Sequence, residues 1–116
     1  MAHSSFQLSV VAPDKTVVDE VVDSVIAPGM QGYFGILAGH EPFVTQLKPG
    51  VVTYRDAAGA ESHVFVAGGF CEASGDSVII LADRAEPPTT KERATSLAAA
   101  EVARQHGHEI DIVDHA

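Results

Sequence analysis

The sequence predicts a mainly β domain followed by one short α-helix, and three observations support this prediction. Residues 1–86 contain short runs rich in Val, Ile, Phe and Thr, separated by Pro and Gly at intervals typical of strands and turns. Residues 89–105 are rich in Ala and contain neither Gly nor Pro. With 116 residues, 46% of them hydrophobic, the chain suffices for one domain with its own core. We therefore expect a β domain over residues 1–86, and a linker, a short helix and a frayed tail over residues 87–116.

The first strands follow from the order of apolar and polar residues. Residues 6–10 alternate between the two kinds, which predicts a strand with one buried face. Residues 17–26 are ambiguous, because their Val and Ile residues recur at nearly helical spacing. The stiffness of Val in a helix and the stop at Pro28-Gly29 favour two strands with a bulge near Asp19-Glu20.

The later strands are separated by recognisable turns. Residues 51–55 and 61–66 flank a short polar and small segment, residues 56–60, which has the length of a hairpin connection. Pro49-Gly50 and Gly68-Gly69 read as further turns between strands. Residues 77–82 supply the last strand before the linker.

The helix is expected over about sixteen residues between two recognisable ends. Thr89 or Thr90 can cap its start, and Gly107 can end it. Its apolar stripe is small, and a helix of this length is only marginally stable alone, so we expect it to pack against the β domain or a partner. The stripe consists of Ala94, Leu97, Ala98 and Val102.

Charge and cysteine content narrow the class of protein. The formal charge of −9 opposes binding to a phosphate backbone, so nucleic acid is not an expected partner. A single cysteine, Cys71, forms no internal disulfide, and the N-terminus resembles no signal peptide. The longest apolar run, residues 78–82, is only strand-sized. We expect a soluble or peripheral protein with no direct membrane insertion.

Residues 28–42 contain four glycines among apolar residues. These glycines do not have the spacing of a phosphate-binding loop. No Lys follows these glycines and no helix pattern comes after them, which excludes the common nucleotide-binding fingerprints. Glycines in such a place let the backbone turn or approach another chain closely. The segment is therefore interpreted as a shaped, exposed edge of the β domain that contacts a partner.

Four separated motifs occur in register along the chain: residues 32–42 (GYFGILAGHEP), 47–50 (LKPG), 68–70 (GGF) and 81–83 (LAD). Together they resemble the epsilon subunit of bacterial F-type ATP synthases over residues 6–85. The resemblance implies a flattened β-sandwich of about ten strands. It also implies a non-catalytic rotor subunit of the central stalk, which couples ion-driven rotation of the membrane ring to ATP synthesis and weakly regulates ATP hydrolysis.

The resemblance also implies partners, a location and a contact surface. The partners are the gamma subunit, the polar loops of the c subunits in the membrane ring and, through the helix, the catalytic hexamer. The location is peripheral, on the cytoplasmic face of the bacterial inner membrane. Family members often have Glu where Tyr33 stands and Pro where Ala38 stands, so aromatic packing or Glu41 is expected to replace an acidic contact. The residues implied to contact the ring are Met30, Gln31, Gly32, Tyr33, Ala38, Gly39, His40, Glu41 and Pro42.

The helical region departs from the family pattern. Many relatives carry two C-terminal helices, whereas the 28 residues from Thr89 onward leave room for one. The residues implied in regulation are Arg93, Ala94, Leu97 and Val102. Some relatives bind ATP at the start of the first helix, but Thr89 and Thr90 here replace the aliphatic residue and the Asp of that motif. No cofactor is therefore expected.

Two other functions remain open from the residues alone. His40, Glu41 and His63 could serve a small metal-dependent β-barrel enzyme, although such sites need three or four closely spaced ligands. The same sandwich could also be a free-standing regulatory binding module. Cys71 is interpreted as a packing residue rather than a nucleophile. The acidic residues at 19, 20 and 23 are interpreted as solvated, and the histidines at 106, 108 and 115 as part of the tail.

Overall fold

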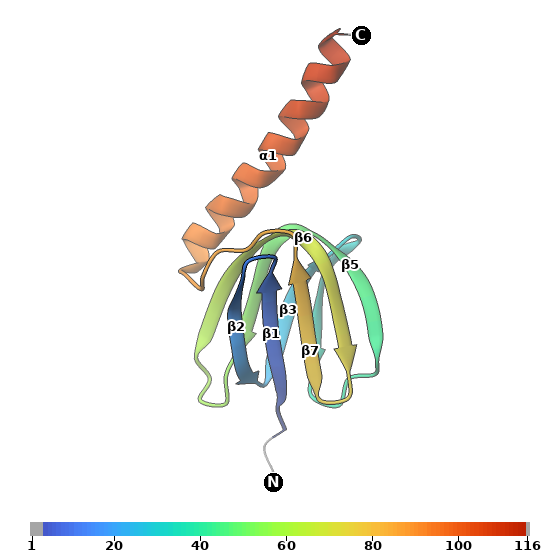
Figure 1. The fold of residues 1–116 in the computed structure, drawn as a ribbon. Coiled ribbons are helices and arrows are strands. Elements are labelled where there is room, and N and C mark those ends of the chain that lie inside the picture. The colour runs from blue at the N-terminus through green and yellow to red at the C-terminus, as the bar shows by residue number, and fades with distance from the viewer. Residues whose placement is uncertain (1–3, 116) are drawn as a thin grey trace.

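The chain forms a curled β-sheet followed by one long helix (Figure 1). The computed structural model describes residues 4–115, and side chains for residues 4–105. Within this range there are seven strands and one helix. They are β1 (Phe6–Ala12), β2 (Lys15–Val22), β3 (Ser24–Gly29), β4 (Gly32–Leu37), β5 (Phe43–Arg55), β6 (Glu61–Ser74), β7 (Ser77–Ala82) and α1 (Lys91–His115).

The seven strands follow the order β2-β1-β7-β6-β5-β3-β4 and curl into a sandwich. Strands β1 and β7 are parallel, and all other neighbours are antiparallel. One face of every strand points inward, as the alternation in β1 predicted, and the inner faces form one apolar core. The mainly β prediction and the sandwich are thus confirmed.

The number of strands is seven rather than about ten, because two expected turns lie inside long strands. Pro49-Gly50 belongs to β5 and Gly68-Gly69 to β6. Both strands arch over the top of the sandwich in Figure 1, so each contributes to both layers. Gly68 and Gly69 have φ angles of 112° and 135°, which bend β6 without ending it.

Residues 17–26 form two strands, as predicted, but the expected bulge is elsewhere. Ser9 and Leu8 pair with Asp19 and Glu20 in regular register. The register shifts at the other end of the pair, where Val10 faces Val18 and Val11 faces Thr16, so that Val17 is the extra residue. Asp23 lies between the end of β2 and the start of β3 and separates the two strands.

The hairpin between β5 and β6 confirms its prediction in detail. Residues 56–60 connect the two strands. The Asp56 side chain accepts hydrogen bonds from the backbone N–H groups of Ala58 and Ala60, at 2.9 and 3.0 Å. Gly59 supplies a φ of 88°, which an Ala would adopt only under strain.

Helix α1 begins where the sequence indicated and extends further. The Thr90 hydroxyl accepts a hydrogen bond from the backbone N–H of Arg93 at 3.2 Å and so caps the helix. The helix passes Gly107 and continues to His115, so the expected short helix with a frayed tail is wrong. A single Gly inside a helix costs only about 1 kcal/mol relative to Ala and does not by itself stop it.

The first half of α1 packs on the outer face of β5 and β6. Ala94 is fully buried there against Val51, Phe65 and Ala67, with Leu97 and Ala98 partly buried beside it. Val102, the last residue of the predicted stripe, is 38% exposed. This contact is small, so few side chains hold the helix against the sandwich.

Leu97→Asp is expected to release α1 from the sandwich. A carboxylate at this half-buried position would lose hydration and the apolar contact, at a cost of about 1.5 kcal/mol. Limited proteolysis should cut the helix several times faster in this variant than in the unaltered chain. Ser96→Asp, at an exposed neighbouring position, is the control. Equal cleavage of both variants would contradict the docking role of Leu97.

Candidate partner-binding surfaces

The glycine-rich segment forms a hairpin tip, a strand and a loop rather than one surface. Residues 30–31 are the turn between β3 and β4, and residues 38–42 connect β4 to β5. These two groups lie at opposite ends of β4, at the upper right and the lower right of Figure 1. The nine residues implied to contact the ring are therefore not brought together. They fall into a tip (Met30, Gln31, Gly32 and Tyr33) and a loop (Ala38, Gly39, His40, Glu41 and Pro42).

The tip exposes large apolar side chains while its base is fixed. Met30 and Tyr33 are 53% and 56% exposed. The Tyr33 hydroxyl accepts a hydrogen bond from the backbone N–H of Val51 at 3.0 Å. Gly50 has no side chain, and a Cβ there would overlap Pro28 and the Tyr33 hydroxyl. Tyr33 is thus held against β5 and presents the flank of its ring to solvent.

The loop of residues 38–42 is anchored by its histidine. The His40 ring packs edge-on against Phe6 with centroids 5.2 Å apart. Its two nitrogens lie 3.1 and 3.3 Å from the carbonyl oxygens of Leu37 and Ser77. Glu41 and Pro42 are exposed. His40 therefore fixes the loop, and its neighbours are the residues that a partner would meet.

A third surface, which the sequence did not indicate, lies on the outer faces of β5, β6 and β7. We call it the outer patch: Val44, Phe70, Ile79 and Leu81. Phe70 faces Leu81 across the β6–β7 pair, and Val44 and Ile79 face Glu72 from its two sides. Val44, Phe70 and Leu81 are 65%, 50% and 52% exposed. These exposed apolar side chains surround Glu72 and make the outer patch a candidate interaction site.

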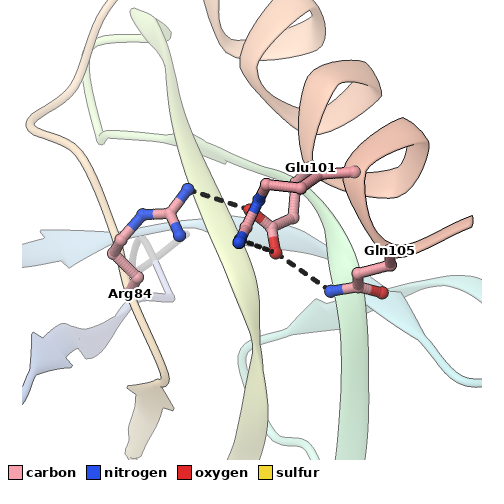
Figure 2. Close-up of polar contacts among 4 residues, drawn as sticks. Arg84, Glu101 and Gln105 are labelled. Carbon is pink, nitrogen blue, oxygen red and sulfur yellow. Dashed lines mark hydrogen bonds and ion pairs between the residues drawn. The ribbon is translucent and has the colours of Figure 1, made fainter. Parts of the chain in front are cut away.

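Sequence reasoning also missed Glu101, a buried acidic residue on α1 (Figure 2). Its carboxylate accepts hydrogen bonds from Arg84 at 2.9 Å, Arg104 at 2.6 Å and Gln105 at 3.0 Å. The hydrogen bonds from Arg104 above all, with those from Arg84 and Gln105, lower the pKa of Glu101 to about 2 against the opposing effect of its burial. Arg84 also lies over the Phe65 ring, 5.5 Å from its centroid. Because Arg84 lies just after β7, at the end of the β domain, this network ties α1 to the sandwich.

A signal for Glu101 exists in the sequence. The residue stands four positions after Leu97, on the apolar stripe of the helix. Partners at the third and fourth positions beyond it, Arg104 and Gln105, lie on the same helix face. A carboxylate on a buried face with a basic residue and an amide at that spacing indicates a paired, buried charge.

The remaining implied helix residues, Arg93 and Ala94, have different surroundings. Arg93 is exposed, whereas Ala94 is buried between the helix and the sandwich. The Thr90 hydroxyl already accepts the N–H of Arg93.

The residues of the alternative metal site have separate surroundings. His40 contacts Phe6, Leu37 and Ser77, whereas His63 contacts the Thr53 hydroxyl at 3.0 Å and Glu61 at 3.7 Å. Among the described residues, no three His, Cys, Asp or Glu side chains are grouped so that they could hold a metal ion. The side chains of the three histidines at 106, 108 and 115 lie outside the described ones.

Cys71 is a core residue of β6, fully buried. Burial raises the pKa of its thiol to about 11. At pH 7.5 we expect a disulfide reagent to label the folded chain at least about a hundredfold more slowly than the urea-unfolded chain. Rapid stoichiometric labelling of the folded chain would show that the thiol is accessible and contradict its packing role.

Helix α1 is not apolar enough to cross a membrane, as judged over the described part of the chain.

Comparisons with known proteins agree on one family. The family model for the β-sandwich domain of the ATP synthase Delta/Epsilon chain matches residues 5–88. The ATP synthase epsilon chain of Moorella thermoacetica is 51% identical over 83 residues, which cover 72% of this chain and 62% of that relative. The epsilon chain of Desulfatibacillum aliphaticivorans is 47% identical over 79 residues, covering 68% and 56%. The chain thus spans less than two thirds of the length of these relatives.

Solved structures show the same sandwich. A chain of the Euglena gracilis mitochondrial ATP synthase, in a structure of OSCP, F1 and the c-ring, matches with a TM-score of 0.68 and 28% identity, over 72% of this chain and 54% of that one. A chain of the central stalk and c-ring of the Tetrahymena thermophila enzyme matches with a TM-score of 0.59 at 12% identity, over 75% and 69%, which supports the fold alone. The motif resemblance, the family model and the relatives lead to one conclusion: the chain belongs to the ATP synthase delta/epsilon chain family.

Proposed function

We propose that the chain is a non-catalytic subunit of the central stalk of an F-type ATP synthase. It turns with the rotor and couples ion-driven rotation of the membrane ring to ATP synthesis. The outer patch is the observation that carries this proposal. The core of the sandwich is complete without its four side chains, so their exposure serves contact with another protein.

The two ends of β4 suggest two neighbours. The loop of residues 38–42 leads directly into Val44 of the outer patch, and His40 reaches Ser77 at the start of β7. We therefore assign the outer patch and this loop to the gamma subunit. The tip, which projects away from them, is assigned to the polar loops of the c subunits. Tyr33 stands there in place of an acid, so this contact is made by packing rather than by charge.

The same proposal covers location and regulation. A rotor subunit bound to the ring would lie peripherally at the cytoplasmic face of the bacterial inner membrane. Helix α1 regulates ATP hydrolysis weakly, through the catalytic hexamer, when it leaves the sandwich.

The experiment measures binding to the gamma subunit of the same complex. Phe70→Glu is expected to weaken binding about tenfold, since a carboxylate would enter an apolar contact. Phe70 is half exposed, so the variant should fold. Val21→Glu is the matched control, because Val21 is 54% exposed on β2, away from the outer patch. Equal affinity of both variants would argue against the outer patch, and no binding by the unaltered chain would refute the proposed function.

A further inference from the structure

The outer edge of β4 has unpaired backbone groups. Strand β4 pairs with β3 on one side only and ends the sheet. Gly29 and Gly32 close the two-residue turn, and the hydrogen-bonded pairs then alternate along the hairpin. Pro28, which has no N–H, faces Tyr33 at a non-bonded position, as this pattern requires. The N–H groups of Tyr33, Gly35 and Leu37 therefore point away from β3.

No other strand covers these groups within the described part of the chain. The carbonyl oxygen of Leu37 contacts His40, at the end of the strand. The backbone of Tyr33 and Gly35 remains open. The edge thus offers a row of donors and acceptors at a repeat of about 6.8 Å, the spacing of alternate residues in a strand.

The two edges of the sheet differ in how they are protected. Strand β2, at the opposite edge, carries Lys15, Asp19 and Glu20 and is interrupted by the bulge at Val17. Charges and bulges of this kind prevent strands of other chains from pairing with an edge. Strand β4 has neither a charged residue nor a proline, and its pairing with β3 is regular over all six residues. Of the two sheet edges in residues 4–115, the edge of β4 is the one open to a further strand.

The side chains beside this edge are apolar and exposed. Tyr33 and Leu37 are 56% and 67% exposed, and Ile26 on the neighbouring strand is 47% exposed. Gly35 pairs with Ile26 and leaves a gap between Tyr33 and Leu37. A Cβ at Gly35 would come no closer than 3.9 Å to another atom, so packing inside the chain does not require glycine there. The gap can receive a side chain from a neighbouring strand.

We propose that the free edge of β4 takes an extended segment of the gamma subunit as an eighth strand, with apolar residues at alternate positions of that segment. This inference rests on the proposed function and specifies how the chain would contact the gamma subunit. Polypeptide backbone satisfies such a row of alternating donors and acceptors. The loop of residues 38–42 joins the Leu37 end of β4 to Val44, so this end of the edge is continuous with the surface assigned to gamma. At the other end, the Tyr33 side chain stays with the tip assigned to the c subunits, and only its backbone belongs to the edge.

Charge favours gamma over a second copy of the chain. Two copies joined along β4 would bring together two proteins that each carry a formal charge of −9. A segment with basic residues at its ends would instead be attracted. The expected partner strand is therefore apolar in the middle and basic at its flanks.

Amide hydrogen exchange of the full chain, alone and bound to gamma, tests this inference. The amides of Tyr33, Gly35 and Leu37 should exchange at least about tenfold more slowly in the complex, because each would donate to the added strand. The amides of β2 should keep their rates. Protection in the free chain that rises with its concentration would identify a second copy as the occupant and overturn the proposal.

Two substitutions at one position provide a matched comparison. Gly35→Pro removes the outward N–H, and prolines are tolerated at such positions of edge strands. Gly35→Ala also removes the glycine but keeps the N–H, and its Cβ fits. We expect about tenfold weaker binding to gamma for the Pro variant and less than about threefold for the Ala variant. If the Pro variant does not fold, the exchange measurement decides.

The outcomes separate the two proposals. A complex with gamma in which the three β4 amides exchange as in the free chain would overturn strand addition and leave the proposed function intact. The absence of any complex with gamma would overturn both. Protection of the three amides, with the expected difference between the Pro and Ala variants, would support both.

Discussion

Gly69→Ala is expected to destabilise the sandwich by about 3 kcal/mol or more. Gly69 has a φ of 135°, which residues with a Cβ rarely adopt. A Cβ there would also overlap the carbonyl oxygen of Leu81 and lie 2.9 Å from the Cα of Ala82. Both atoms are backbone of β7, so β6 and β7 would have to separate at the arch. Urea unfolding followed by circular dichroism measures the loss.

Gly59→Ala is the control for this prediction. Gly59 also has a positive φ, 88°, but a Cβ there would have no atom within 4 Å. Its cost is limited to backbone strain, about 1 kcal/mol. If both variants lose the same stability, the close approach of β6 and β7 is not what requires glycine at position 69.

Glu101→Ala is expected to loosen α1 by about 2 kcal/mol. The carboxylate side chain is 4% exposed, and the change removes its hydrogen bonds to Arg84 and Arg104, whose side chains are 52% and 66% exposed. Both guanidinium groups then return to water, which keeps the loss moderate. Amide exchange in the first half of α1 should accelerate. Glu92→Ala, at an exposed position of the same helix, should change the rate of amide exchange in α1 little.

The contribution of Glu101 should depend on pH with a defined sign. Its pKa in the folded chain is about 2, lowered from 4.5. A lowered pKa means that the stabilisation is fully present above about pH 4.5 and is lost as the pH falls toward 2. The stability difference between the unaltered chain and Glu101→Gln should therefore shrink over this interval. A difference that stays constant from pH 5 to pH 2 would show that the charge of Glu101 does not hold the helix.

Local signals predicted those parts of the fold that local interactions determine. The hairpin at residues 56–60 and the cap at Thr90 each depend on a side chain that bonds to backbone within a few residues. The arches at Pro49-Gly50 and Gly68-Gly69 could not be distinguished from turns. Whether a glycine ends a strand or bends it depends on whether the partner strand continues beside it, and here β5 and β6 bend together.

The partner-binding surfaces were predictable only in part, for a similar reason. The motifs indicated residues 30–33 and 38–42, but residues 34–37 of β4 lie between these two groups. Only the extended conformation of this strand shows that the groups lie at its opposite ends. The outer patch joins residues from three strands, and its exposure follows from the register of β5, β6 and β7. Glu101 was missed despite the spacing of its partners, because acidic side chains on helices usually point into solvent.

Reconstitution of the rotary ATP synthase with and without this chain tests the central claim most directly. The measurement is ATP synthesis driven by an imposed ion gradient, alongside the rate of ATP hydrolysis by the same preparation. We predict that gradient-driven synthesis is low without the chain, rises when the chain is added, and rises less with Phe70→Glu than with Val21→Glu. Synthesis that is the same with and without the chain would contradict its role as a coupling subunit of the rotor.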